Sequence, residues 1–343
     1  MAFITINKTH FFHNLALLSK KAGGKERLIA VLKDNAYGHD LVLMARLAAE
    51  YGLIRAAVKT IDEAYQIAPL FQEVLVLVDH PRSELLAPNI SLAAHAFDAL
   101  EALPKGSAIH LSIDTGMHRN GIKYEEIEQA LALIIKRGLV LKGVFTHFRS
   151  ADEFNGEFFW QRSNFERAKV KIKALAASYG LEGIHFHCCN SAGLLRCASL
   201  GEGELTRPGI AMYGYTTLDE RIATYDLKPV LSLWAEKLSS RILKKGERVG
   251  YGGVYQAKSD ELISTYDIGY GDGFFRFDGL EPVVMSDASL TKGRMSMDSF
   301  CLGGDAQKVC VFDNADLLAR HFQTISYEIT TKLSASLKRI VIE

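Results

Sequence analysis

The chain has 343 residues, and its 40 basic and 40 acidic side chains cancel, so the formal net charge is zero at pH 7. Charge of both signs is interspersed along the chain, which offers no electrostatic footprint for nucleic acid or for an anionic membrane surface, and we expect neither partner. A hydrophobic fraction of 48% is ordinary for a globular protein, and the length exceeds one small core.

The N-terminus and the cysteines favour the cytoplasm. Residues 1–12 lack the basic and then apolar pattern of a secretory signal, and no apolar run approaches the ~20 residues that cross a bilayer. The five cysteines are odd in number and contain no CxxC pair, which argues against a disulfide framework and against a structural zinc site. We therefore expect a cytoplasmic protein with reduced thiols and no metal.

Apolar runs of strand length alternate with amphipathic segments through the first two thirds of the chain. A strand at Ala2–Ile6 and a helix from Lys8 come first. The barrel strands that we predict are Arg27–Lys33, Ala56–Val58, Val74–Val78, Leu92–Ala96, Ala108–Asp114, Leu141–Phe148, Gly183–Asn190 and Leu205–Gly214. Helical spacing predicts helices over Asp40–Tyr51, Tyr124–Lys136 and Glu157–Tyr179. Eight strands alternating with helices predict an α/β fold with an N-terminal (β/α)8 TIM-type barrel.

After about Tyr225 the pattern becomes rich in short strands and glycine turns. The extended segments that we predict here are Lys228–Arg241, Glu261–Asp267, Val283–Met285, Ser299–Leu302 and Val309–Phe312. One helix is predicted at Ala315–Phe322. We therefore predict two domains, a barrel at 1–225 and a C-terminal mostly-β domain at 226–343.

Reactive residue types gather where the predicted barrel strands end. Active sites of such barrels lie at the carboxyl ends of the strands. The residues found there are Lys33, Arg119, His147, Ser191 and Arg207. A solvated strand-end side chain is the alternative for each, a surface salt bridge for Arg207 and a helix N-cap for Ser191. The spacing alone does not name a reaction.

A series of sequence blocks does point to one family. In chain order they are AVLKDNAYGH at 30–39, DTGMHRNG at 114–121, FTHF at 145–148, NSA at 190–192, RPGIAMYG at 207–214, VGYG at 249–252, GYGDG at 269–273, RMSMD at 294–298 and TISYE at 324–328. Together these blocks resemble the alanine racemases over nearly the whole chain. The resemblance implies an isomerase that uses pyridoxal 5'-phosphate (PLP) to interconvert L- and D-alanine.

The resemblance implies two catalytic bases on opposite faces of the substrate. Lys33 matches the lysine that carries PLP and acts as one base. Tyr251 matches a tyrosine that the partner subunit supplies, which implies a homodimer with shared active sites. Ionising an ordinary tyrosine at pH 7 costs about 4 kcal/mol, and His147 and Arg207 match residues that offset part of this cost, with His147 bridging the other two. The alternative for Tyr251 is a ring packed over a Gly-rich turn.

A cofactor site follows from the same resemblance. Arg207 matches the residue that faces the ring nitrogen of PLP, and because arginine keeps its proton, that nitrogen stays unprotonated and PLP becomes a weaker electron sink. The matching phosphate ligands are Tyr37, Ser191, Tyr327 and the backbone N–H groups of Gly209 and Ile210.

Four further positions match residues that contact or admit the substrate. Arg119 and the backbone of Met297 match groups that bind its carboxylate, and Tyr270 and Asp298 match residues at a narrow entrance. Each could instead be a turn or packing residue.

The chain departs from the family pattern in three places. Many members carry a carbamylated lysine where this chain has Ser112, so we hypothesise that a small anion such as chloride orients Arg119 instead; density for water alone beside Arg119 would count against this. Ser336–Arg339 replaces the usual Arg-Val-Pro-Arg stretch, and the segment between Asp298 and Tyr327 is short. These departures leave substrate range open.

Other functions remain as alternatives. A racemase for serine or for a broader set of amino acids fits the same blocks. A non-catalytic PLP-binding protein would end after the barrel and have no equivalent of Tyr251. PLP-dependent decarboxylases share the two-domain plan but carry a glycine-rich phosphate loop and a cysteine block that we do not find here. Supply of D-alanine for peptidoglycan is implied by the resemblance only, and a catabolic role fits the chemistry equally.

Overall fold

The computed structural model of the chain describes residues 1–79 and 84–343. These residues form two compact units. The barrel unit contains Phe12–Ala36 and Leu41–Leu227, and the C-terminal unit contains Met1–Phe11, Tyr37–Asp40 and Lys228–Glu343. The sequence assigned the whole of 1–225 to the barrel, whereas the first eleven residues belong to the C-terminal unit because β1 (Phe3–Asn7) pairs with β10 (Leu231–Leu243).

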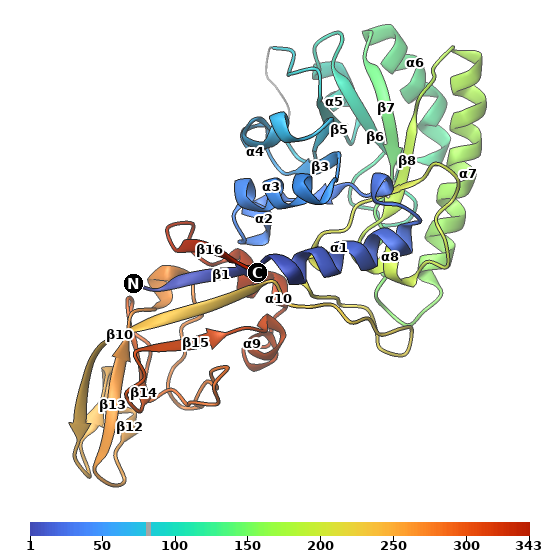
Figure 1. Ribbon diagram of the computed structural model, residues 1–343. Coiled ribbons are helices and arrows are strands. Elements are labelled where there is room, and N and C mark those ends of the chain that lie inside the picture. Colours follow the sequence, from blue (N-terminus) through green and yellow to red (C-terminus); the bar gives the residue numbers. More distant parts are fainter. Residues whose placement is uncertain (80–83) are drawn as a thin grey trace. The chain divides into compact units, whose positions relative to one another are not determined.

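The barrel unit is built on a parallel sheet with strands in the order β2-β3-β4-β5-β6-β7-β8-β9 (Figure 1). These strands are Ala30–Val31, Arg55–Val58, Glu73–Val76, Ile90–Ala94, Ala108–Ser112, Val140–Phe145, His185–Cys189 and Leu205–Thr206. The sheet closes on itself, since the Ile29 N–H donates to the Thr206 carbonyl at 2.8 Å and the Val31 N–H donates to the Pro208 carbonyl at 3.1 Å. The predicted TIM-type barrel is confirmed, although β2 and β9 are much shorter than their apolar runs.

Helices lie outside the barrel strands (Figure 1). They are α1 (Lys8–Ala22), α2 (Lys33–Tyr37), α3 (Leu41–Tyr51), α4 (Ile61–Ile67), α5 (Phe97–Ala102), α6 (Ile127–Arg137), α7 (Glu157–Ser178) and α8 (Ser191–Arg196). The helix α6 shows why the periodic pattern succeeds, because Ile127, Leu131 and Ile134 are buried on one face. It ends at Gly138, whose φ of 65° suits glycine.

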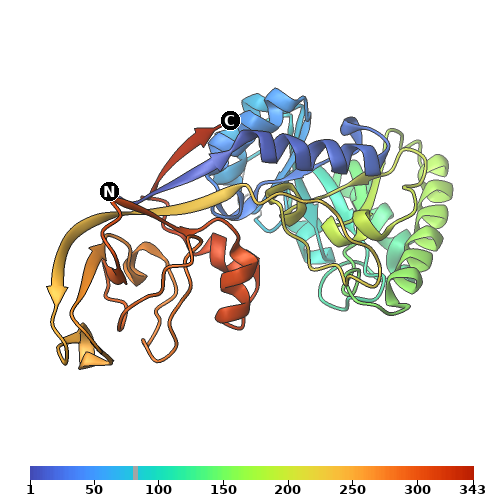
Figure 2. The same ribbon diagram turned by 60° about the horizontal axis from the view of Figure 1, so that its bottom comes forward.

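The C-terminal unit contains a mostly antiparallel sheet in the order β14-β13-β10-β1-β16, with β15 also paired to β10. Its further elements are β11 (Arg248–Val249), β12 (Tyr255–Gln256), β13 (Glu261–Tyr266), β14 (Phe300–Gly303), β15 (Lys308–Phe312), α9 (Ala315–His321), α10 (Ser326–Thr331) and β16 (Lys338–Ile342). Figure 2 shows β10 as a long bent strand. Its first half pairs with β15 through Leu233–Glu236, and its second half pairs with β13 from Lys237 onward, with a register shift between Lys237 and Ser239.

The predicted mostly-β character of this region is confirmed, with one error in detail. The strand predicted at Val283–Met285 was wrong, because the segment forms only an isolated bridge between Val284 and Leu290 within a turn-rich stretch. The sequence analysis did not predict β16, because its charged and apolar residues do not alternate as in a half-buried strand. Among the described helices, none combines the length and apolar character that would carry it through a bilayer.

Candidate active site

Four of the predicted site residues come together at the carboxyl ends of the barrel strands. Lys33 follows β2, Arg119 lies in the loop after β6, His147 follows β7 and Arg207 follows β9. The pKa of His147 is lowered to about 3, first because surrounding protein displaces water from the ring and then because Arg207, Arg119 and Lys33 are positively charged neighbours. His147 is therefore neutral at pH 7.

Lys33 begins an unusual backbone turn. The next three residues, Asp34, Asn35 and Ala36, have φ of 51–55° and ψ of 46–53°, and Tyr37 has φ of 54°. This is a turn of left-handed helix made without glycine, and such a conformation costs roughly 1–2 kcal/mol per residue. Strain of this size persists only where surrounding contacts stabilise the strained conformation, so this turn fixes the position of the Lys33 backbone.

Glu63 holds the turn in place. One of its carboxylate oxygens accepts from the Asn35 N–H at 3.0 Å, and the other accepts from the Lys59 N–H at 2.8 Å. The Asn35 side chain then accepts from the Leu41 N–H at 2.9 Å, which closes the turn onto the start of α3. The sequence analysis missed Glu63; its signal was the Thr-x-x-Glu capping box at Thr60, which the structure contains at α4.

Arg207 is buried, and its two terminal guanidinium nitrogens donate hydrogen bonds to residues of the barrel. Its Nη1 donates to Nδ1 of His187 at 2.7 Å and to the His187 carbonyl at 3.0 Å, and its Nη2 donates to the Thr146 carbonyl at 2.7 Å. Among the described residues we find no hydrogen bond from its Nε–H. Burial lowers the pKa of Arg207 to about 10, so the guanidinium stays charged at pH 7. Because Arg207 is buried, the alternative that it forms a surface salt bridge is excluded.

Ser191 is the first residue of α8 and is not its cap. Asn190 caps this helix, since its side chain accepts from the Gly193 N–H at 2.8 Å. The Ser191 hydroxyl instead accepts from the N–H groups of Gly209 and Ala211, at 3.0 and 3.2 Å. Among the described residues the Ile210 N–H has no acceptor. Ser191 and the segment after Arg207 thus form one cluster of hydroxyl and backbone N–H donors suited to an anion.

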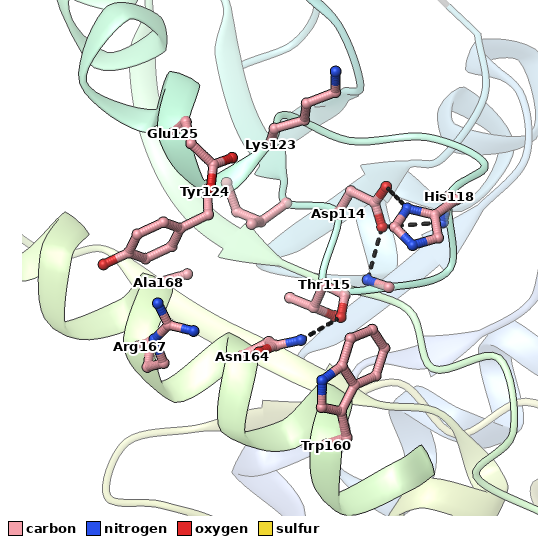
Figure 3. A pocket seen from close by; sticks show the side chains of 12 residues that line it. Asp114, Thr115, His118, Lys123, Tyr124, Glu125, Trp160, Asn164, Arg167 and Ala168 are labelled. Atoms are coloured by element: carbon pink, nitrogen blue, oxygen red, sulfur yellow. Dashed lines mark hydrogen bonds and ion pairs between the residues drawn. The ribbon is translucent and has the colours of Figure 1, made fainter.

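The loop that carries Arg119 is folded around Asp114 (Figure 3). The Asp114 carboxylate accepts from the N–H groups of Gly116 and His118, at 2.9 and 3.1 Å. Gly116 has φ of 134°, and a Cβ there would lie 2.2 Å from the Trp160 ring of α7. Figure 3 shows Trp160 and Asn164 of α7 directed at this loop, beside a cavity of about 320 Å³. The cavity is lined by none of Lys33, His147 and Arg207.

Two predicted phosphate ligands meet within the C-terminal unit. The rings of Tyr37 and Tyr327 lie 5.8 Å apart, centroid to centroid. The next residue, Gly38, has φ of 84°, and a Cβ there would come within 2.0 Å of the Thr330 carbonyl oxygen. Arg339 donates to the Gly38 carbonyl at 2.9 Å. The departure from the family at 336–339 thus leaves an arginine that anchors the Tyr37 segment.

The other predicted residues of this unit gather around the segment 294–298. The Gly271 N–H, beside Tyr270, donates to the Met297 carbonyl at 2.8 Å. A Cβ on Gly269 would lie 1.9 Å from that same carbonyl, so only glycine permits the approach. Tyr251 is 67% exposed on a glycine turn packed near Arg294, and Asp298 is also exposed. These side chains are exposed on the unit, and the role of Tyr251 as a second base stays a prediction.

His187 contacts the predicted site residue Arg207 and was not singled out by the sequence analysis. It lies fully buried on β8 and is the ring that contacts Arg207 directly, whereas no described hydrogen bond joins the His147 ring to Arg207. The predicted bridging role of His147 stays a prediction. The alternation His185-Phe186-His187 placed two histidines on one face of a strand and was the available signal.

Comparison with known proteins gives a consistent result across both units. The family model described as "Alanine racemase, N-terminal domain" matches residues 6–217, and "Alanine racemase, C-terminal domain" matches 230–341. A curated alanine racemase from Nitratiruptor sp. is 46% identical over all of both chains.

Two solved structures extend this comparison. Alanine racemase from Bacillus anthracis, solved with bound L-Ala-P, is 28% identical with a TM-score of 0.87, covering 100% of this chain and 95% of that one. A histidine racemase from Leuconostoc mesenteroides is 25% identical with a TM-score of 0.82, covering 100% and 98%.

Proposed function

The chain belongs to the alanine racemase family, and we propose that it interconverts L- and D-alanine with PLP held at the carboxyl end of the barrel. The observation that carries this proposal is the gathering of Lys33, Arg119, His147 and Arg207 at that end, each on a different strand or loop. Two-base proton transfer needs such a set around one α-carbon.

The residues present fit PLP. A buried, charged Arg207 that keeps its Nε–H uncommitted suits a ring nitrogen that accepts a hydrogen bond. The Ser191 hydroxyl and the Ile210 N–H offer donors for a phosphate, and the Gly209 N–H is next to them. Tyr37 and Tyr327, whose rings lie 5.8 Å apart within the C-terminal unit, are the further phosphate ligands in this proposal. Bound PLP would supply the electron sink that makes the α-proton of an amino acid acidic.

Each protein residue then has a separate task. The Lys33 amine takes or returns the proton at one face of the α-carbon, and the left-handed turn fixes its position. Arg119 binds the substrate carboxylate. His147, neutral because its pKa is lowered to about 3, can accept a hydrogen bond from the second base. Arg207 stays positively charged and so gives the ring nitrogen a donor without giving up its proton.

The second base in this proposal is Tyr251 of the partner subunit. Its exposure on a glycine turn, together with exposed Met297 and Asp298, supports a role at a surface completed by another chain. We propose a homodimer in which this surface, with Tyr270 and the Met297 backbone, closes the site over the substrate. We further propose a cytoplasmic enzyme, consistent with five free cysteines, that supplies D-alanine for peptidoglycan.

The test is chiral chromatography of purified protein incubated with PLP and single L-amino acids. We expect D-alanine from L-alanine, with L-serine turned over more slowly. L-histidine belongs in the panel because the fold is shared with a histidine racemase. Faster inversion of histidine or serine would move the proposal to that substrate, and binding of PLP without any inversion would favour the non-catalytic alternative.

The shared site has its own test. Lys33→Ala and Tyr251→Phe chains are each expected to be inactive alone, and mixing them should form hybrid dimers with one intact site. Absence of recovered activity, after mass spectrometry has proved subunit exchange, would contradict the assignment of Tyr251 to the partner's site.

A further inference from the structure

A line of polar side chains runs through the inside of the barrel from Arg207 to its opposite end. Arg207 Nη1 lies 2.7 Å from Nδ1 of His187, and Nε2 of His187 lies 2.7 Å from Nδ1 of His110 on β6. Nε2 of His110 then lies 2.8 Å from Oε1 of Glu73, the first residue of β4. Both histidines are fully buried, so water cannot substitute for these contacts.

The two ends of this line determine where each proton lies. Arginine is only a donor, so Nδ1 of His187 must accept and its Nε2 must carry the proton. Nε2 of His187 therefore donates to Nδ1 of His110, which leaves the His110 proton on Nε2. That proton needs an acceptor, and an ionised carboxylate is acceptor-only. With Glu73 as the last acceptor, each ring nitrogen of His187 and His110 has one hydrogen-bond partner, and all the bonds run in the same direction from Arg207 to Glu73.

The surrounding residues are shaped to hold this line. Gly143 on β7 leaves the space that the His110 ring fills, because a Cβ there would lie 2.4 Å from Nδ1 of His110. The pairing of β6 with β7 shifts register at this point, where Ile109 pairs with Leu141 and His110 pairs with Gly143, so the glycine lies directly beside His110. Phe145 stacks on His187 with centroids 5.1 Å apart and planes within 7°. Both rings are thereby fixed in orientation.

Glu73 faces the amino ends of the strands, away from the residues of the candidate active site. It lines a cavity of about 210 Å³ with Arg55, Lys142 and His185, and its side chain is 18% exposed. Its Oε2 lies 3.4 Å from Nε of Arg55, so the two carboxylate oxygens have separate partners. The pKa of Glu73 is lowered to about 2 against the cost of burial, with His110 the first stabilising partner, so the acceptor stays ionised.

We propose that Glu73 and His110 are positioning residues for Arg207, holding it through His187 in a single hydrogen-bonding state. The effect on racemisation rests on the proposed function, because Arg207 matters there only if it faces the cofactor ring. The hydrogen-bonding state itself is a property of this chain and can be measured separately.

The experiment is ¹⁵N NMR of holoenzyme labelled in its histidine rings, combined with steady-state kinetics. In the wild-type protein we expect His187 and His110 both neutral with the proton on Nε2. In Glu73→Gln the amide can donate as well as accept, so we expect mixed tautomers at both rings and a fall in kcat of about 10- to 100-fold, the range for losing an outer hydrogen-bond partner, with KM changed less.

Arg55→Gln is the matched control. It removes the partner of Oε2 at the same end of the barrel and leaves the contacts of Oε1 with His110 and Ser91 in place. We expect both tautomers to stay as in the wild type and kcat to stay within about twofold, even if the melting temperature falls as far as in Glu73→Gln. A merely structural role for Glu73 would make the two variants alike.

Gly143→Ala gives a second route that alters no polar group, and we expect it to displace His110 and reproduce the Glu73→Gln effect. A proton on Nδ1 of His187 in the wild-type protein, or Glu73→Gln with unchanged tautomers and kcat, would overturn the proposal. If wild-type tautomers are as predicted but no amino acid is racemised, the positioning of Arg207 stands and the proposed function is the part that fails.

Discussion

The barrel unit and the C-terminal unit hold their predicted site residues in opposite ways. Arg207 is buried in the barrel and donates to three separate acceptors. Lys33 directly precedes a strained left-handed turn that Glu63 stabilises by a hydrogen bond. Tyr251, by contrast, is 67% exposed on a turn between glycines, and Met297 is 55% exposed. The barrel positions its residues by itself, whereas the C-terminal unit presents residues that need a second surface to complete their environment.

This contrast separates two kinds of mutational effect. Changes at the barrel residues disturb buried hydrogen bonds and can alter both chemistry and folding. Changes at the exposed tyrosines should alter chemistry alone, because surface substitutions usually shift stability by under about 0.5 kcal/mol.

The largest effect is expected for Lys33→Ala, with loss of racemisation by at least about 10³-fold, because removing a general base and the cofactor attachment leaves no group for proton transfer on that face. Lys59→Ala is the matched control, since Lys59 also directly follows a barrel strand and only pairs with Asp34 at the surface. Chiral chromatography should show the control within a few-fold of the wild type. Equal losses in both would contradict a specific role for Lys33.

Tyr251→Phe should lower kcat by about 10²-fold or more, the usual contribution of a positioned acid or base, while the melting temperature stays unchanged. Tyr65→Phe, on the exposed side of α4, serves as the control because its ring is 50% exposed. Measuring kcat and the melting temperature of both variants separates a loss of catalysis from a loss of stability. A stability loss in Tyr251→Phe without a loss in kcat would show that its role is packing.

Gly38→Ala should destabilise the protein by about 3 kcal/mol, because its Cβ would collide with the Thr330 carbonyl at 2.0 Å while the backbone remains at φ of 84°. Gly203→Ala has φ of 66° but open space around its Cβ, so it should cost only about 1 kcal/mol. Urea unfolding of the two variants separates crowding from backbone strain. Similar losses would contradict the close approach at Gly38.

The smallest effect concerns acid stability. The pKa of Glu73 is lowered from 4.5 to about 2 in the folded chain, so its contribution is fully present above pH 4.5 and is lost as the pH falls toward 2. Between pH 5 and pH 3 the wild type should lose about 2 kcal/mol more unfolding free energy than Glu73→Gln, as measured by urea titration. An equal loss of unfolding free energy in both proteins would show that the pKa of Glu73 is not lowered in the folded chain.

The sequence predicted the barrel well because buried parallel strands are continuous apolar runs and the helices between them have a clear period. It predicted Lys33, His147 and Arg207 as neighbours because they end different strands of one barrel. It could not give the left-handed turn at 34–37, since Asp, Asn and Ala carry no mark of positive φ comparable to glycine.

The inner line of His187, His110 and Glu73 was also beyond the sequence. These residues come from three strands and are far apart along the chain, so only the closed barrel brings them together. The shortness of β9 and the membership of β1 in the C-terminal unit have the same cause, because strand pairing is decided by distant partners and not by local pattern.

The most direct test of the account is incubation of the purified protein with PLP and L-alanine in deuterated water, followed by mass spectrometry of the separated enantiomers. We predict D-alanine that carries deuterium at the α-carbon, absent in Lys33→Ala, with exchange but little inversion in Tyr251→Phe. Inversion that survives in Lys33→Ala, or wild-type protein that neither exchanges nor inverts L-alanine, would contradict it.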